Sequence, residues 1–284
     1  MDTVLECHGR LAALLGSGAE SVDVLRRAEE HRRYWRPERV KVVLLAESHV
    51  YTTAEELART IALPSSAPPD LPRGFVRLVY CLGYGENRLL NRPIESPANT
   101  GTPHFWKILY SCANEIATNS DFAPIQTSTT SPAERIANKL VLLRRLRELG
   151  VWLLDTSLAA LYLPGRPKMG PAILEACLQV GWDHHVGHVV EAAVPSHIVC
   201  IGKGVARALG KRLSDVGVPV TVVPQPNARL ASADHHESFR TYYRAWFARP
   251  TNLSSRVLVV CCLTRFAADG GRRDNELPRL KPGR

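Results

Sequence analysis

The stretch VKVVLLA at residues 40–46, which runs into the polar residues Glu47, Ser48 and His49, decides the fold expected for this sequence. A short run of β-branched and other apolar residues is typical of a strand buried on both faces, as the strands of parallel sheets are. Because the run stops abruptly at polar residues, we expect it to be a core strand whose carboxyl end opens into a functional loop.

Similar runs recur along the chain and alternate with helical patterns. Further strands are predicted at residues 75–82, 151–157, 197–202 and 218–223. Helices are predicted at residues 18–36, from about 104, and at about 133–149, 171–179, 182–193, 203–216 and 238–247. This alternation predicts an α/β fold, a three-layer sandwich with a central, mainly parallel β-sheet flanked by helices.

The composition is that of an ordinary globular protein. Of the 284 residues, 45% are hydrophobic and 22% are charged. We expect residues 1–250 to form a single domain and residues 251–284 to be a partly disordered C-terminal extension. The sequence has no run of about 18 apolar residues and starts without a signal-peptide pattern, which predicts a cytoplasmic monomer that does not enter a membrane.

The charge balance favours a polyanionic partner. The 36 Lys and Arg residues outnumber the 27 Asp and Glu residues, giving a formal net charge of +9. Nucleic acid is the first partner that such a surplus suggests, although arginine bias in a GC-rich genome explains it equally well. Basic patches at residues 26–39 and 144–147 fit phosphate contacts, and they equally fit solvated helix faces.

We expect no metal or organic cofactor. The seven cysteines show no CxxC spacing and read as buried free thiols. Histidines at positions 184, 185 and 188, and the group at 235–237, could bind zinc, but surface or capping roles are favoured. No GxGxxG follows the first strand and no Walker motif occurs, which disfavours dinucleotide and P-loop chemistry.

The residues after each predicted strand are the place to look for a site, because ligands of parallel sheets bind beyond the carboxyl ends of the strands. These strand-end motifs, in this order, resemble those of the uracil-DNA glycosylase superfamily. The matching stretches are AESHVY at 46–51, LGYGE at 82–86, FWK at 105–107, GVWLLDT at 150–156 and QPNAR at 225–229. The resemblance covers roughly residues 38–247.

The resemblance implies a DNA glycosylase of base excision repair. Such an enzyme flips uracil, or another deaminated base such as hypoxanthine or xanthine, out of single- or double-stranded DNA and hydrolyses its N-glycosidic bond. Glu47, Ser48 and Gln225 occupy the positions of the catalytic residues. The alternatives are that Glu47 is a solvated or capping carboxylate, and that the loop around Gln225 is a surface turn.

Other positions correspond to base and DNA contacts. The resemblance makes Tyr84 the ring that stacks on the base, with His49 and Tyr51 as further base-binding residues. Asn227 and Arg229 correspond to DNA contacts. Tyr84 equally suits the edge of the core, and His49 equally suits a cap.

Asp155 replaces the asparagine that reads the base edge in the family. An asparagine offers both a donor and an acceptor, whereas an ionised aspartate only accepts. Asp155 therefore suits an N–H of uracil, hypoxanthine or xanthine, and it predicts a specificity that is broader than uracil or shifted toward other deaminated bases. The alternative is an aspartate that caps the turn at Thr156 and Ser157.

Two other classes of function remain open at this point. A nucleoside or nucleotide hydrolase would use the same strand-end site on free small molecules and would have no affinity for DNA. A catalytically inactive nucleic-acid-binding protein would bind DNA in a salt-dependent way without releasing a base.

Overall fold

A computed structural model describes residues 2–94, 102–163, 165, 169–225, 232–247 and 258–259 of the chain. Its centre is a sheet of parallel strands in the order β2-β1-β3-β4-β5. The strands are β1 (Val42–Ala46), β2 (Val151–Asp155), β3 (His197–Ile201), β4 (Val220–Val223) and the two-residue β5 (Leu258–Val259).

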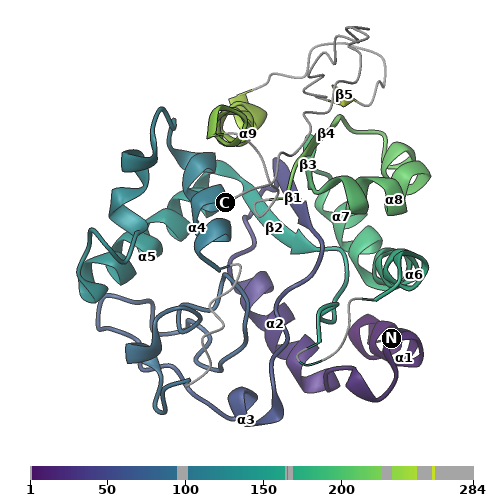
Figure 1. The fold of residues 1–284 in the computed structure, drawn as a ribbon, viewed down its shortest axis with the longest axis horizontal. Helices are drawn as coiled ribbons and strands as arrows, with labels where there is room; N and C mark the ends of the chain where they lie inside the picture. Colours follow the sequence, from purple (N-terminus) through teal and green to yellow (C-terminus); the bar gives the residue numbers. More distant parts are fainter. Residues whose placement is uncertain are drawn as a thin grey trace, which may run out of the picture.

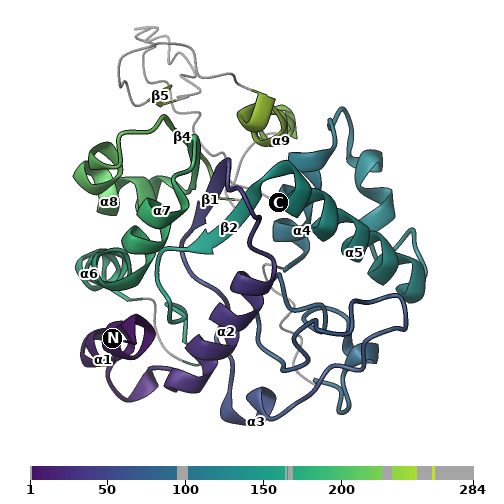
Figure 2. The same cartoon turned by 180° about the vertical axis from the view of Figure 1, so that it is seen from behind.

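Helices cover both faces of this sheet, which confirms the predicted α/β sandwich (Figure 1). One side carries α4 (Thr102–Ala113), α5 (Pro132–Leu149) and α9 (Ser232–Phe247), and the other carries α6 (Pro171–Gly181), α7 (Gly187–Ala193) and α8 (Lys203–Asp215). Seen from behind, α2 (Val22–Tyr34) crosses below the strands, and α1 (Thr3–Leu15) lies beside α6 (Figure 2). The shorter elements are α3 (Ala54–Leu57), the 3₁₀ turns at Gly16–Gly18, Asn87–Leu89 and Asn119–Ile125, and a π-helical turn at Trp182–Val186.

The junction of α5 with β2 shows how local sequence sets the elements. Ser131 caps the start of α5 by accepting a hydrogen bond from the Glu134 amide, and Pro132 occupies the first turn. The helix ends at Gly150, whose φ of 82° lies in the left-handed region that glycine adopts without strain. A Cβ there would lie 2.7 Å from the Arg39 carbonyl oxygen, so this close approach also requires glycine.

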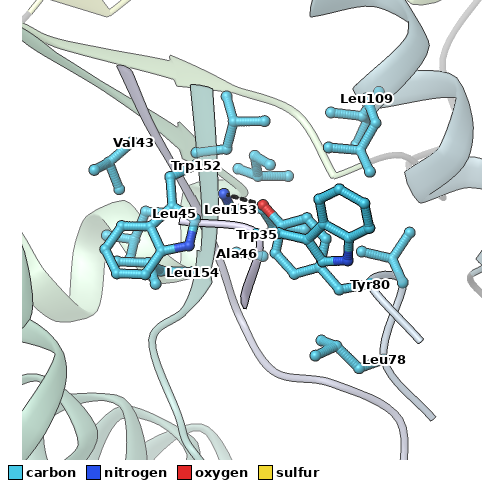
Figure 3. Close-up of a cluster of buried hydrophobic side chains, with 14 of the residues drawn as sticks. Trp35, Val43, Leu45, Ala46, Leu78, Tyr80, Leu109, Trp152, Leu153 and Leu154 are labelled. Carbon is cyan, nitrogen blue, oxygen red and sulfur yellow. Dashed lines mark hydrogen bonds between the residues drawn. The ribbon is translucent and has the colours of Figure 1, made fainter. Parts of the chain in front are cut away.

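Strand β1 is the centre of the core. All five of its residues are buried, as expected for a strand covered on both faces. Figure 3 shows Val43 and Leu45 of β1 among the side chains of β2, with Trp35 and Tyr80 packed nearby. The register pairs Ala46 with Asp155, so β1 and β2 end side by side.

The segment 75–82 is not the strand that its apolar run predicts. Its apolar side chains are buried, but its backbone makes local turn bonds, such as Leu78 N–H to the Val76 carbonyl and Cys81 N–H to the Leu78 carbonyl. The Leu153 N–H of β2 donates instead to the Tyr80 hydroxyl, at 2.7 Å (Figure 3). A side chain therefore takes the hydrogen bond that a neighbouring strand would have made, and a short apolar run does not reveal this.

Helix bounds differ from the predictions mainly at the two ends of the chain. Helix α1 was not predicted, and α9 begins at Ser232 rather than at residue 238. Asp2 caps α1 by accepting hydrogen bonds from the Val4 and Leu5 amides. Within the part of the chain that the structure describes, no helix is both long enough and apolar enough to cross a membrane.

The first prediction concerns His31 of α2, which is buried and donates from Nε2 to the Gly74 carbonyl at 2.8 Å. Burial lowers the pKa of this imidazole from 6.5 to about 4. Because the unfolded chain takes up the proton first, the stability tied to neutral His31 is complete above pH 6.5 and is lost as the pH falls toward 4. The slope should reach at most about 1.4 kcal/mol per pH unit.

Urea unfolding at several pH values between 7 and 4 tests this prediction. The His31→Gln variant keeps a donor for Gly74 and should lose stability less steeply over this range than the wild type. The matched control is His188→Gln, because the His188 side chain is 65% exposed and should leave the slope unchanged. Equal slopes for the wild type and His31→Gln would contradict the lowered pKa of His31 as the source of this pH dependence.

Candidate active site

The carboxyl ends of β1 and β2 are joined by hydrogen bonds between the loops that follow them. The Thr156 amide and hydroxyl both donate to the Ala46 carbonyl, at 2.8 and 2.7 Å. The Ser157 amide donates to the Glu47 carbonyl at 2.9 Å, and the Leu161 amide donates to the Ser48 hydroxyl at 3.4 Å. The loop that carries Glu47 and Ser48 is thereby held in place along its length.

The Glu47 side chain meets Gln225, the second residue after the end of β4. Its Oε2 accepts hydrogen bonds from the Gln225 amide at 3.2 Å and from the Tyr162 hydroxyl at 2.8 Å. Burial, together with this carboxylate, raises the pKa of Tyr162, so the phenol keeps its proton and donates. Two predicted catalytic residues thus lie together, with Tyr162 as a third member that the sequence did not indicate.

A cavity of about 40 Å³, which we call the strand-end cavity, is lined by Ser48, the neighbour of Glu47 in the sequence. Four of its lining residues were predicted as site residues, namely Ser48, His49, Tyr84 and Asp155. The remaining wall is Val50, Arg77, Leu78, Val79, Phe105 and Leu153. The cavity therefore combines aromatic rings with a carboxylate, an imidazole and a hydroxyl.

Asp155 is held in place by a series of buried charged side chains. Its Oδ2 accepts from Arg32, and Arg32 also donates to Glu29 at 2.6 Å. Burial alone would lower the pKa of Arg32, but the Asp155 and Glu29 carboxylates outweigh this effect and raise it. Burial would likewise raise the pKa of Glu29, yet Arg32 and His185 hold it well below its usual value.

This series of charged side chains corrects two readings of the sequence. Asp155 pairs with Arg32 instead of capping Thr156 and Ser157, and Arg32 is only 1% exposed, so it is no phosphate contact. Other arginines of the 26–39 patch, among them Arg33 and Arg36, are exposed.

Glu20 performs a similar anchoring task on the other side of the cavity. Its two carboxylate oxygens accept from the Thr52 amide at 2.7 Å, the Ala160 amide at 2.8 Å and His49 Nε2 at 2.9 Å. The side chains of Glu20 and His49 are both fully buried. One carboxylate from the turn before α2 therefore fixes His49 and both loops around the site.

Arg77 and Glu56 close the wall next to Tyr84. Arg77 donates to both carboxylate oxygens of Glu56, and its guanidinium lies 6.0 Å from the Tyr84 ring centroid. Burial raises the pKa of the Glu56 carboxyl, but hydrogen bonds from Arg77 and Thr53 lower it by more, so the pair is charged. The Tyr84 ring is thus held at the cavity by a fixed cation.

Tyr51, Asn227 and Arg229 are the remaining predicted site residues. Tyr51 does not line the strand-end cavity. Asn227 and Arg229 lie outside the described residues. Sequence reasoning missed Glu20, Arg32 and Tyr162, for which no motif gave a signal, and it noted Phe105 only as part of FWK.

The three histidines weighed for zinc at positions 184, 185 and 188 have other partners. His185 contacts Glu29 and Thr3, His184 contacts Glu6, and His188 contacts Glu191. Among the described residues, no group of three or more His, Cys, Asp or Glu side chains is arranged to hold a metal ion.

No known protein-family model matches this chain, and no curated protein matches it. The arrangement of the site therefore carries the functional argument that follows.

The second prediction concerns the Arg32 guanidinium. Replacing it in Arg32→Met leaves the buried Asp155 carboxylate without its cation and Glu29 with only His185, and should cost about 3–5 kcal/mol of unfolding free energy. The matched control is Arg145→Met, because Arg145 and its partner Glu148 are 56% and 66% exposed and such a pair contributes at most about 1 kcal/mol. Urea unfolding of both variants at pH 7 measures the difference, and equal small losses would contradict the structural role of Arg32.

Proposed function

We propose that this chain is a DNA glycosylase that excises uracil, and other deaminated bases, by hydrolysis of the N-glycosidic bond. The observation that carries the proposal is a held carboxylate, Glu47, whose neighbour in the sequence, Ser48, lines a cavity together with two aromatic rings and the Asp155 carboxylate. Both lie at the carboxyl edge of a parallel sheet, where ligands of such folds bind.

Glu47 has the geometry of a general base. Both donors, Tyr162 and Gln225, bond to its Oε2, and among the described residues Oε1 has no hydrogen-bond partner. A carboxylate fixed through one oxygen presents the other to a water molecule. In the proposed reaction the water oxygen bonds to the sugar carbon, its proton passes to Glu47, and the carbon–nitrogen bond breaks with its electron pair on the base.

The strand-end cavity has the chemistry that a flipped base requires. Tyr84 and Phe105 offer ring faces on which a planar base stacks. Because Asp155 Oδ2 is engaged by Arg32, Oδ1 is the oxygen that remains to accept a base N–H. Ser48 adjoins Glu47 and lines the cavity, so it suits the orientation of the water rather than its deprotonation.

The third prediction tests Glu47. With labelled uracil-containing DNA and alkaline cleavage of abasic sites, Glu47→Gln should lower the excision rate by at least about 100-fold, because the general base is removed. The matched control is Glu55→Gln, since Glu55 is 85% exposed and pairs only with Arg59 among the described residues. Unchanged cleavage by Glu47→Gln would contradict its role.

The same assay separates the alternatives. Salt-dependent DNA binding without base release would identify an inactive binding protein. Release of bases from free nucleosides, without affinity for DNA, would identify a small-molecule hydrolase.

The fourth prediction concerns specificity at Asp155. An acceptor-only carboxylate suits uracil N3–H and hypoxanthine or xanthine N1–H alike, so excision rates for the three bases should agree within about tenfold, the factor that one hydrogen bond is worth. The Asp155→Asn variant offers an added donor, which uracil O4 and the O6 of hypoxanthine or xanthine accept alike, so it should leave the ratios of the three rates unchanged. A strict uracil preference of the wild type would overturn this expectation.

A further inference from the structure

The proposed reaction leaves negative charge on the departing base and needs a proton donor there. By the resemblance, Gln225 stands where the family uses a histidine to stabilise the anionic base, but its amide donates to Glu47 and it does not line the strand-end cavity. The donor must therefore come from the cavity wall. Arg77, which does line the cavity, directs its Nε and a terminal nitrogen to Glu56.

His49 lines the cavity, and one of its ring nitrogens has no hydrogen-bond partner among the described residues. Its Nε2 bonds to Glu20 Oε2 at 2.9 Å, and its side chain is fully buried. Its Nδ1 is also buried and has no hydrogen-bond partner among the residues that the structure describes. A buried polar atom without a partner is costly, which points to a ligand that completes it.

Glu20 determines which nitrogen of His49 can exchange a proton. A carboxylate only accepts, so Nε2 carries a hydrogen whenever the bond to Glu20 is made. The two nitrogens of an imidazole point away from each other, so Nδ1 lies on the side of the ring away from Glu20. The Thr52 and Ala160 amides bond to the same carboxylate and keep it in place.

On the basis of the proposed function, we propose that His49 is the general acid that protonates the departing base through Nδ1, and that Glu20 is its positioning residue. As the carbon–nitrogen bond breaks, its electron pair moves onto the base and the Nδ1 proton passes to the base. The proton that water gives to Glu47 balances the one that His49 gives up, so a proton returns to His49 through solvent before the next cycle. The net reaction adds water across the glycosidic bond.

The charged groups around His49 are part of this arrangement. Glu20 faces it from the turn before α2, and Asp155 from the end of β2 lines the same cavity. Arg77 and Tyr84 line the cavity from the 75–84 segment, where Arg77 is held by Glu56. Two carboxylates therefore lie near the His49 ring, and the arginine of the cavity wall is paired with Glu56.

A leaving-group comparison tests the general acid. On uracil DNA, His49→Gln should lower the single-turnover excision rate by about 100-fold or more, the usual contribution of a positioned acid. On 5-fluorouracil DNA, whose departing base is a more stable anion, the same variant should lose no more than about tenfold. The matched control is His197→Gln, a partly buried histidine that bonds to Thr221 and lies outside the cavity, and it should excise both bases at wild-type rates.

The Glu20→Gln variant tests the positioning role. Its excision rate should fall more on uracil DNA than on 5-fluorouracil DNA, as for His49→Gln, but by a smaller factor. A purely structural defect would lower the rates on both substrates equally. Thermal unfolding of each variant identifies those that fail to fold.

A nitrogen-15 NMR titration of the wild-type protein with free uracil provides a readout besides activity. The Nδ1 resonance of His49, assigned by its absence from His49→Gln, should move, while the Nε2 resonance stays near its free position. Suppose that the wild type excises uracil but the excision rate of His49→Gln falls equally on both substrates, or does not fall. The general-acid role then fails and the proposed function stands. If the wild type excises no base from DNA, the proposed function itself fails.

Discussion

The ion pair between Arg32 and Asp155 is the interaction on which the architecture of the site depends. It joins α2 to the last residue of β2, and Trp152 reinforces the same contact by donating from its indole to the Arg32 carbonyl at 2.9 Å. Both side chains are buried, so each charge needs the other to offset the cost of its burial. The helix and the sheet edge must therefore assemble together, and the wall of the strand-end cavity forms in the same event.

The same physical device recurs around the cavity. Glu20 joins the loops at Thr52 and Ala160, Glu56 holds Arg77, and Glu86 is buried against Arg135 and Lys139 at 2.6–2.7 Å. These loops lie beyond the ends of the strands, where no sheet hydrogen bonds can order them. Charge-assisted hydrogen bonds in a medium of low dielectric constant replace those bonds and fix the side chains before a substrate arrives.

The sequence predicted what depends on local pattern and missed what depends on long-range pairing. The runs at 42–46, 151–155, 197–201 and 220–223 are strands because a continuous apolar run between helices fits a buried parallel sheet. The same reasoning failed for residues 75–82, where a tyrosine hydroxyl replaces a strand. The partner of Asp155 is 123 positions away, and no spacing rule connects the two. Glu47 and Gln225 were found because both closely follow strands that end at one edge.

The hydroxyl of Tyr80 has a consequence for how the protein behaves in a crowded solution. The outer strand of a sheet presents unsatisfied amides that can template another chain, and proteins that leave such a strand open risk ordered self-association. Strand β2 is the outer strand on its side, and its Leu153 amide is already engaged by Tyr80. The Tyr80 hydroxyl thus occupies one of the amides with which a foreign strand would have to pair.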